Sequence, residues 1–226
     1  PRTLIKKDNQ SNILPSHIGL RKYIPYQTTL FPEQVACLAQ YTLMPNACGT
    51  LSLAFDGNGV KAELWGASLT PIPLGREPNR YHILLLIQLS PYGLYQMIRQ
   101  SQAEFADKRL SLADIDYELY KLLHQAFVVS ETTGGLVNAC EKILYQRMEK
   151  QAVSDALLFA AAYISGRHGR TQVQEVARQS GYSERHLNRL FLTQIGMNVK
   201  NYARLIRFNY VLKQIQTSPC FFAALS

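Results

Sequence analysis

The sequence of 226 residues has few charged residues, few cysteines and no long apolar run, and each shortage excludes a class of protein. Charged residues make up 18% and hydrophobic residues 47%, which is typical of a folded globular chain and not of a disordered one. The longest apolar stretch, Ala156 to Ile164, is about half of the ~18 residues that a membrane-spanning helix needs. We therefore expect no membrane-spanning segment, and one large domain or two modest ones.

The cysteines Cys37, Cys48, Cys140 and Cys220 include no Cys-x-x-Cys pair and no histidine at matching spacing. We therefore expect no structural zinc site and interpret the cysteines as small buried hydrophobes. The first twenty residues contain no run of seven apolar residues, which argues against a secretory signal there. A cytoplasmic protein without a metal or a cofactor is the expectation.

Common catalytic motifs are missing as well. The sequence has no Gly-x-Ser-x-Gly, no His-Glu-x-x-His, no phosphate-binding loop and no cysteine with a plausible histidine partner. A His-x-His pair with a downstream Glu, which the metal-binding version of a cupin barrel would need, is also missing. The Gly-x-Gly of Asp56-Gly57-Asn58-Gly59 precedes strand periodicity and not a helix, so it does not predict a nucleotide site. These absences predict that the protein is not an enzyme.

The first part of the chain has the patterns of β-strands. Residues 60–64 alternate apolar and charged side chains, and Thr50 to Phe55 precedes the Asp56–Gly59 turn, so we expect a β-hairpin. His82 to Leu89 is a nearly continuous apolar run that indicates a buried strand, with His82 as a core residue. The aromatic side chains of this part, Trp65 among them, are interpreted as core before pocket. Weaker strand candidates are Tyr23–Leu30 and Gln34–Leu43.

Helical periodicity begins at Ser90, which we expect to cap a helix with Pro91 at its first position. A second helix is expected from Leu112 to Phe127, and a third after Thr133-Gly134-Gly135. The expected buried side of the second helix consists of Ile115, Leu119, Leu122, Leu123 and Phe127. Strands followed by helices predict an α+β fold, with an N-terminal β-barrel-like domain and trailing helices.

The composition changes in the polar segment Lys150–Ser154, which we interpret as a domain boundary. The expected domains are residues 1–152, for sensing or dimerisation, and residues 153–226, which are all-α. Residues 1–150 hold 15 Lys and Arg against 13 Asp and Glu, whereas residues 151–226 hold 9 against 3. A basic last third beside a nearly neutral body indicates a polyanionic partner, most commonly nucleic acid. The first helix of this part is expected to begin at Asp155 and to bury Leu158, Ala161, Ala162 and Ser165.

Residues 171–194 have the spacing of a helix-turn-helix. Ala177, Gly181, Leu187 and Leu190 stand at offsets of zero, four, ten and thirteen. A small residue lets the two helices approach, a glycine adopts the left-handed conformation of the turn, and two leucines hold the second helix on the first. The spacing therefore predicts two short helices joined by Ser180-Gly181-Tyr182.

The second of these helices has a polar face suited to reading DNA. Ser183 is its expected N-cap, and Arg185, Asn188 and Arg189 share one face. Arginine can donate two hydrogen bonds to guanine and asparagine can pair with adenine, so we expect this trio to contact the major groove. The alternative is an ordinary solvated face. His186 is interpreted as a phosphate neighbour or a packed edge residue.

A longer helix is expected from Val199 to about Gln216, with Asn198 as its cap. Lys200, Arg204 and Arg207 recur along one side at helical spacing. Such a stripe is either solvated or, beside a helix that reads DNA, able to hold phosphates.

Residues 180–212 resemble the DNA-binding domain of AraC/XylS-type transcriptional regulators. The resemblance rests on Gly181-Tyr182-Ser183-Glu184-Arg185-His186-Leu187-Asn188-Arg189-Leu190-Phe191, then Gly196, Lys200, Ala203-Arg204, Arg207-Phe208 and Val211-Leu212. Tyr23-Ile24-Pro25-Tyr26, Met44-Pro45-Asn46-Ala47-Cys48-Gly49 and Ser90-Pro91-Tyr92-Gly93 are similar to the amino-terminal domain of one subgroup. The resemblance implies a bacterial, cytoplasmic regulator with a sensing or dimerising domain and two helix-turn-helix units joined by a long helix.

The sequence departs from this family after the connecting helix, because residues 218–226 match only the opening of a second unit. This predicts a truncated or processed form, or a naturally short regulator, with weak DNA binding by the chain alone unless dimerisation restores a second contact. We expect double-stranded DNA as the partner, with Ser183, Arg185, His186, Asn188, Arg189, Lys200 and Arg204 as the DNA-binding residues. A small-molecule effector and a homodimer fit the same architecture. The alternative is a ligand-binding or dimerisation protein whose helix-turn-helix makes protein contacts.

Overall fold

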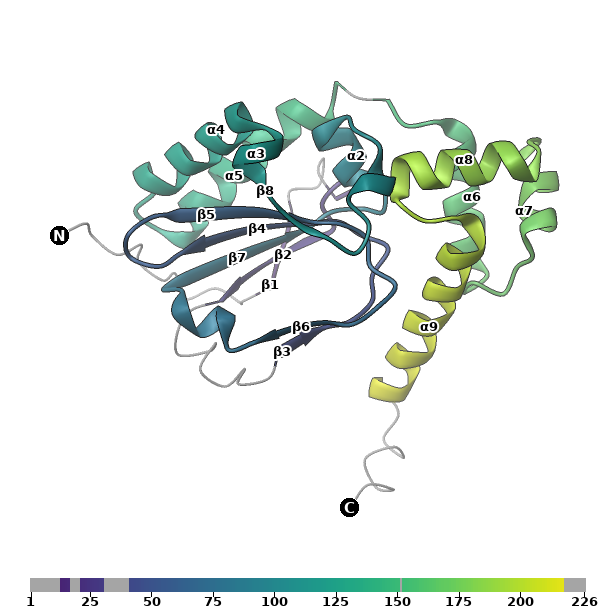
Figure 1. The fold of residues 1–226 in the computed structure, drawn as a ribbon, viewed down its shortest axis with the longest axis horizontal. Helices are drawn as coiled ribbons and strands as arrows, with labels where there is room; N and C mark the ends of the chain where they lie inside the picture. Colours follow the sequence, from purple (N-terminus) through teal and green to yellow (C-terminus); the bar gives the residue numbers. More distant parts are fainter. Residues whose placement is uncertain (1–12, 17–20, 31–40, 151, 218–226) are drawn as a thin grey trace, which may run out of the picture.

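The computed structural model describes residues 13–16, 21–30, 41–150 and 152–217. Within these ranges the protein is mixed α/β, with antiparallel sheets first and helices after them, as the strand and helix patterns predict. Figure 1 shows the sheets at one end of the molecule, with α3, α4 and α5 along one face, and the last four helices at the other end. None of the helices in the described ranges combines the length and the apolar character needed to span a bilayer.

Two antiparallel sheets form the N-terminal part. The larger has the strand order β1-β2-β7-β4-β5-β8 and the smaller pairs β3 with β6. The strands are β1 (Ile13–Pro15), β2 (Tyr26–Leu30), β3 (Tyr41–Leu43), β4 (Thr50–Phe55), β5 (Val60–Trp65), β6 (Ile72–Gly75), β7 (Ile83–Gln88) and β8 (Arg109–Ser111). The barrel-like closure remains a prediction, because residues 31–40, between β2 and β3, lie outside the described part.

The β4–β5 hairpin is confirmed, with Phe55 opposite Val60 across the turn. Asp56 holds this turn by accepting hydrogen bonds from the backbone of Asn58 at 2.9 Å and of Gly59 at 3.0 Å. The buried strand within His82–Leu89 is confirmed as β7, but His82 itself is exposed just before the strand begins. Of the weaker candidates, Tyr23–Leu30 contains β2 and Gln34–Leu43 ends in β3, while residues 34–40 lie outside the described ranges.

In the described ranges the N-terminal part contains four α-helices, and side chains cap the last two of them. They are α2 (Gly93–Ile98), α3 (Leu112–Ile115), α4 (Tyr117–Val129) and α5 (Thr133–Met148), with short 3-10 turns η1 (Glu77–Arg80) and η2 (Gln102–Glu104). The expected start at Pro91 is wrong, since α2 begins at Gly93 without a side-chain cap. Thr132 caps α5 by accepting a hydrogen bond from the Gly135 N–H at 3.1 Å.

The single helix expected from Leu112 to Phe127 is wrong, because Asp116 divides it into α3 and α4. The Asp116 carboxylate accepts a hydrogen bond from the Leu119 N–H at 2.9 Å and pairs with Arg147 of α5. Leu122, also expected to be buried, is 50% exposed. Leu119, Leu123 and Phe127 are buried as expected.

The C-terminal part consists of α6 (Asp155–Gly166), α7 (Val173–Ser180), α8 (Glu184–Ile195) and α9 (Val199–Thr217). The predicted inward face of α6 is correct at Ala161 and wrong at its other three positions. The helix buries Ala156, Leu157, Ala160, Ala161 and Ile164, whereas Leu158, Ala162 and Ser165 are exposed. The run is apolar on every side, so its periodicity cannot define the inward face and packing against α7, α8 and α9 decides it.

The two parts share a packed interface. Ala47 and Ala67, from loops beside the sheets, are buried in the same cluster as the cores of α6 to α9. Gly196, after α8, approaches η2 so closely that a Cβ there would lie 2.7 Å from the Gln102 carbonyl oxygen. The C-terminal end of α8 is therefore seated directly on the N-terminal part.

Candidate nucleic-acid interface

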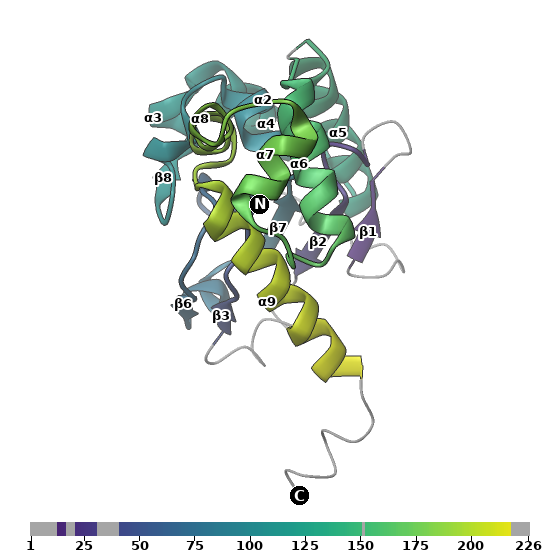
Figure 2. The ribbon, with the colours of Figure 1, turned by 90° about the vertical axis from the view of Figure 1, so that its right-hand side faces the viewer.

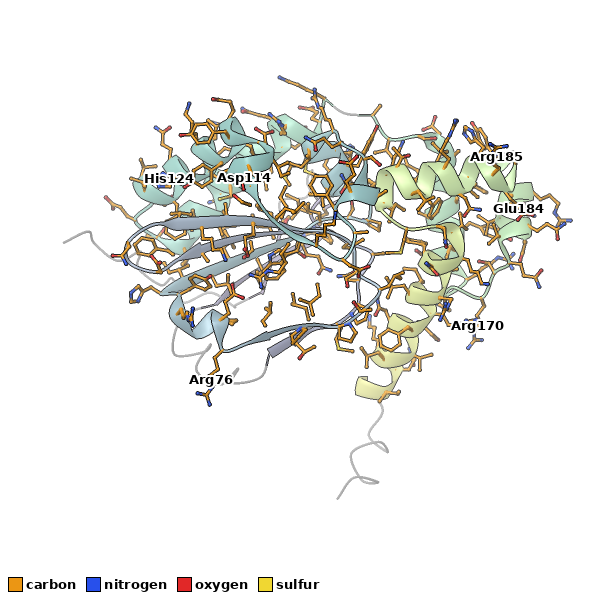
Figure 3. The ribbon with its side chains drawn as sticks, in the orientation of Figure 1. Arg76, Asp114, His124, Arg170, Glu184 and Arg185 are labelled. Carbon is orange, nitrogen blue, oxygen red and sulfur yellow. The ribbon has the colours of Figure 1, made fainter. Side chains whose placement is uncertain are left out.

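The last four helices carry a basic surface. All nine lysine and arginine side chains of residues 152–217 are exposed, and the only acidic side chains there are Asp155, Glu175 and Glu184. The basic residues are Arg167, Arg170, Arg178, Arg185, Arg189, Lys200, Arg204, Arg207 and Lys213. In Figure 3 Arg170, Glu184 and Arg185 lie at the end of the molecule farthest from the sheets, so part of this surface is remote from the N-terminal part.

A tight glycine turn joins α7 to α8. Gly181 has a φ of +75°, the left-handed conformation that its spacing predicts. The Tyr182 N–H donates to the Ala177 carbonyl at 3.1 Å and the Gly181 N–H donates to the Arg178 carbonyl at 3.3 Å. These two bonds form a Schellman motif, which satisfies the last carbonyls of α7 and fixes the direction of the chain into α8.

Local caps and a buried face hold α8. Ser183 caps the helix as predicted, because its hydroxyl accepts a hydrogen bond from the His186 N–H at 3.2 Å. Leu187, Phe191 and Ile195 are buried on one side, and Phe191 meets Tyr202 of α9 edge to face at a centroid distance of 5.3 Å. Burial raises the pKa of the Tyr202 phenol to about 12, so it stays protonated at neutral pH.

The opposite side of α8 presents Arg185 and Arg189 to solvent. Arg185 makes no hydrogen bond or ion pair with any described residue. Arg189 Nη2 lies 3.3 Å from His186 Nδ1. The His186 ring stacks on Tyr182, with 4.9 Å between centroids and 13° between planes. The His186 ring is therefore packed at the edge of this face, where it also lies beside Arg189. Tyr182, 45% exposed beside this face, is a candidate contact that the sequence analysis did not single out.

The predicted trio is not a uniform face, because Asn188 is engaged inside the protein. Its side-chain oxygen accepts a hydrogen bond from the Val199 N–H at 3.1 Å, at the first residue of α9. Asn198 caps the same helix end as predicted, by accepting a hydrogen bond from the Asn201 N–H at 2.8 Å. Asn188 is half-buried, and pairing with adenine would need the oxygen that α9 now uses. The structure therefore gives Asn188 a positioning role between α8 and α9.

A second basic group lies on α9 and faces the start of α7. Lys200, Arg204 and Arg207 are exposed, and none makes an ion pair with a described residue. Together with Gly169, Thr171, Gln172, Val173, Val199 and Ala203 they line a hollow of about 310 Å³. Gly169 allows the close approach of this loop to α9, since a Cβ there would lie 2.1 Å from the Ala203 carbonyl oxygen. Figure 2 shows α6 and α7 beside α9 at this end of the molecule.

The N-terminal part contains a charged cluster that the sequence analysis missed. Arg109 of β8 donates to Glu77 at 2.7 and 2.8 Å and to Glu63 at 2.6 Å, and its guanidinium lies 5.0 Å from the Trp65 ring centroid. The hydrogen bonds from Arg109 lower the pKa of Glu77 to about 2. The cavity beside the cluster is only about 10 Å³, which is room for about one water. Trp65 is 4% exposed, in agreement with the core interpretation.

Within the described ranges no three His, Cys, Asp or Glu side chains gather closely enough to hold a metal ion. Cys48 and Cys140 are free cysteines, and burial raises the pKa of each thiol to about 12. Neither thiol is therefore ionised near neutral pH. Cys140 is buried as the interpretation expects, whereas Cys48 is half-buried.

Comparison of the chain with known protein families, with curated proteins and with solved structures gave no match.

Proposed function

We propose that this chain is a sequence-specific DNA-binding transcriptional regulator of the AraC/XylS type, with α8 as the recognition helix of a helix-turn-helix. The observation that carries the proposal is the pair Arg185 and Arg189, which is exposed on the first half of α8 directly after the Schellman turn. Recognition helices contact bases with residues of their N-terminal half, and arginine reads guanine through two hydrogen bonds. Among the described residues neither side chain is neutralised by an acidic partner.

The stripe of Lys200, Arg204 and Arg207 supplies the sequence-independent part of the affinity. These three cations are exposed and lack ion pairs in the described part of the chain. Their positive charges are therefore available to pair with DNA phosphates. Ser183 and His186, at the start of α8, are proposed to lie beside the phosphate backbone. Asn188 supports the site from inside by fixing α9 against α8.

The N-terminal part is proposed to sense an effector or to mediate a homodimer, in a bacterial cytoplasmic protein. Its contact with the recognition helix supports a coupled role, because η2 lies against the residue that follows α8. A displacement of η2 would therefore shift the end of α8 directly, because no linker separates the two.

A helix-turn-helix that contacts another protein is the second candidate. The observation that favours it is the exposure of two large apolar side chains of this unit, Tyr182 at 45% and Leu192 at 42%. A partner protein could bury both, whereas base reading needs the arginine pair.

Selection of bound duplexes from a random-sequence pool, at near-physiological salt, tests the proposal. We expect the wild-type chain and Arg76→Ala to enrich the same short motif, and the double variant Arg185→Ala/Arg189→Ala to enrich none. Arg76 is a matched control, since it is an exposed arginine that Figure 3 shows at the sheet end, far from Arg185. Near-physiological salt suppresses the non-specific phosphate attraction that a basic surface of this kind produces.

Enrichment of the same motif by the double variant would refute base reading by α8. No enrichment by any of the three, together with capture of a protein partner that Leu192→Ala abolishes, would support the protein-contact function instead. Thermal unfolding of each variant must match the wild type, because both arginines are exposed and their loss removes no packing.

A further inference from the structure

A second hollow, of about 350 Å³, lies where the two parts of the molecule meet. One wall consists of Pro45, Leu69 and Pro71, from the loops beside β3 and β6. The other wall is a stripe of α9 formed by Asn201, Arg204, Leu205 and Phe208. These four residues are spaced i, i+3, i+4 and i+7, so one face of the helix looks toward the loops. Figure 1 shows α9 running along the side of the molecule that these loops reach.

The loop wall of this hollow is held in place without a ligand. The backbones of Asn46 and Ser68 exchange two hydrogen bonds, at 2.9 and 2.8 Å, which joins the two loops. Asp107 then accepts hydrogen bonds from the Ser68 hydroxyl at 2.8 Å and from the Leu69 N–H at 3.1 Å. A wall already fixed in this way costs little ordering entropy when a ligand binds.

The lining combines an apolar surface with one cation. Leu69 is 40% exposed and Phe208 is 43% exposed, so each has apolar area left to bury. Arg204 makes no ion pair with a described residue, and no acidic side chain lines the hollow. Asp107, which accepts hydrogen bonds from Ser68 and Leu69, does not line the hollow. The complementary ligand therefore carries one negative charge on an apolar body.

The volume of the hollow limits the size of the apolar part of the ligand. A dry cavity of about 150 Å³ holds benzene, so about 350 Å³ accommodates roughly two fused aromatic rings and a carboxylate. The space beside the Arg109 cluster is far too small for such a molecule.

We propose that this hollow is a binding site for a small monocarboxylic acid with a flat apolar body, whose carboxylate is held by Arg204. Asn201 supplies a side-chain amide beside the same position, and Leu205 and Phe208 bury the rings against Leu69 and the two prolines. The ligand bridges the N-terminal part and α9. This deepens the effector-sensing part of the proposed function, but binding is tested without DNA, so the two proposals can fail separately.

The test measures binding of 2-naphthoate and of its neutral isostere 2-naphthamide by titration calorimetry and ligand-observed NMR. We expect saturable binding of 2-naphthoate to the wild-type chain at millimolar concentration or better. Arg204→Gln should lower that affinity about tenfold or more, because it removes a charge-assisted hydrogen bond. The same change should alter 2-naphthamide binding little. Phe208→Ala should weaken both compounds.

Arg207→Gln is the matched control for naphthoate binding. It removes the same charge from the same exposed helix, but Arg207 does not line this hollow. We expect it to leave the naphthoate affinity within about twofold, because water weakens the interaction of an exposed charge that does not touch the ligand. Equal losses in Arg204→Gln and Arg207→Gln would overturn the site, since they would show a general charge effect. Absence of saturable 2-naphthoate binding to the wild-type chain would also overturn it.

Discussion

Replacing Asn188 by alanine should lower the stability of the protein. If Asn188 lay on an exposed face of α8, as the sequence predicts, the same change would leave the stability unchanged. The Asn188 side-chain oxygen accepts a hydrogen bond from the Val199 N–H at 3.1 Å, and Val199 is fully buried. This N–H is one of the first four of α9, which have no partner within the helix. Its loss leaves a donor unsatisfied, at a cost of about 1–2 kcal/mol in the free energy of unfolding.

Asn188→Asp tests whether the side-chain oxygen is the group that stabilises α9. It keeps an oxygen at the same place and adds a negative charge near the N-terminus of α9, which is favourable by about 0.3–1 kcal/mol. We therefore expect Asn188→Asp to be at least as stable as the wild type, while the new negative charge on α8 weakens DNA binding.

Thermal unfolding and urea unfolding, both followed by circular dichroism, measure both variants. For a chain of this size the alanine variant should lose about 2–8 °C in Tm and show a lower urea midpoint at an unchanged slope. An alanine variant as stable as the wild type would refute the positioning role of Asn188. An aspartate variant as unstable as the alanine variant would show that the amide nitrogen, and not the oxygen, holds the helix.

Three further changes test other parts of the structure. Gly169→Ala should cost more than about 3 kcal/mol, because its Cβ would lie 2.1 Å from the Ala203 carbonyl oxygen at a φ of +72°; urea unfolding close to wild type would contradict this contact. Ser183→Ala should cost about 1 kcal/mol through loss of the α8 cap, whereas Ser183→Asp should cost little, and equal urea midpoints for the two would argue against capping. The lowered pKa of Glu77 adds stability that is complete above its ordinary pKa and is lost as the pH falls toward about 2. Glu77→Gln should therefore be less stable than the wild type by about 1–2 kcal/mol near neutral pH, after allowance for solvent screening, and the gap should close as the pH falls; a gap independent of pH would show that the charge contributes nothing.

The features that the sequence predicts correctly depend on neighbours close along the chain. The β4–β5 hairpin needs only one turn and two short alternating strands. The turn at Gly181 and the cap at Ser183 each use groups within five residues of one another. Their residue types are therefore visible at fixed offsets.

The features that the sequence does not predict depend on partners far along the chain. Arg147 joins Asp116 across 31 positions, and Arg109 joins Glu63 across 46. Asn188 looks like a free polar position on α8 because its partner belongs to another helix. The inward face of α6 is likewise undefined in a segment that is apolar on all sides. A polar residue on the face of one helix is thus an ambiguous signal until the neighbouring helix is placed.

Base reading by α8 is the central claim, and single-base-pair discrimination by Arg189 tests it most directly. The measurement is the binding free energy of the wild type and of Arg189→Ala on the selected duplex and on each single-base-pair variant of it, at one salt concentration. We expect the alanine variant to lose about 1–3 kcal/mol of discrimination at one or two adjacent base pairs and to keep it elsewhere. An equal loss of affinity on every duplex, with discrimination unchanged at every position, would contradict the claim and make Arg189 a phosphate contact.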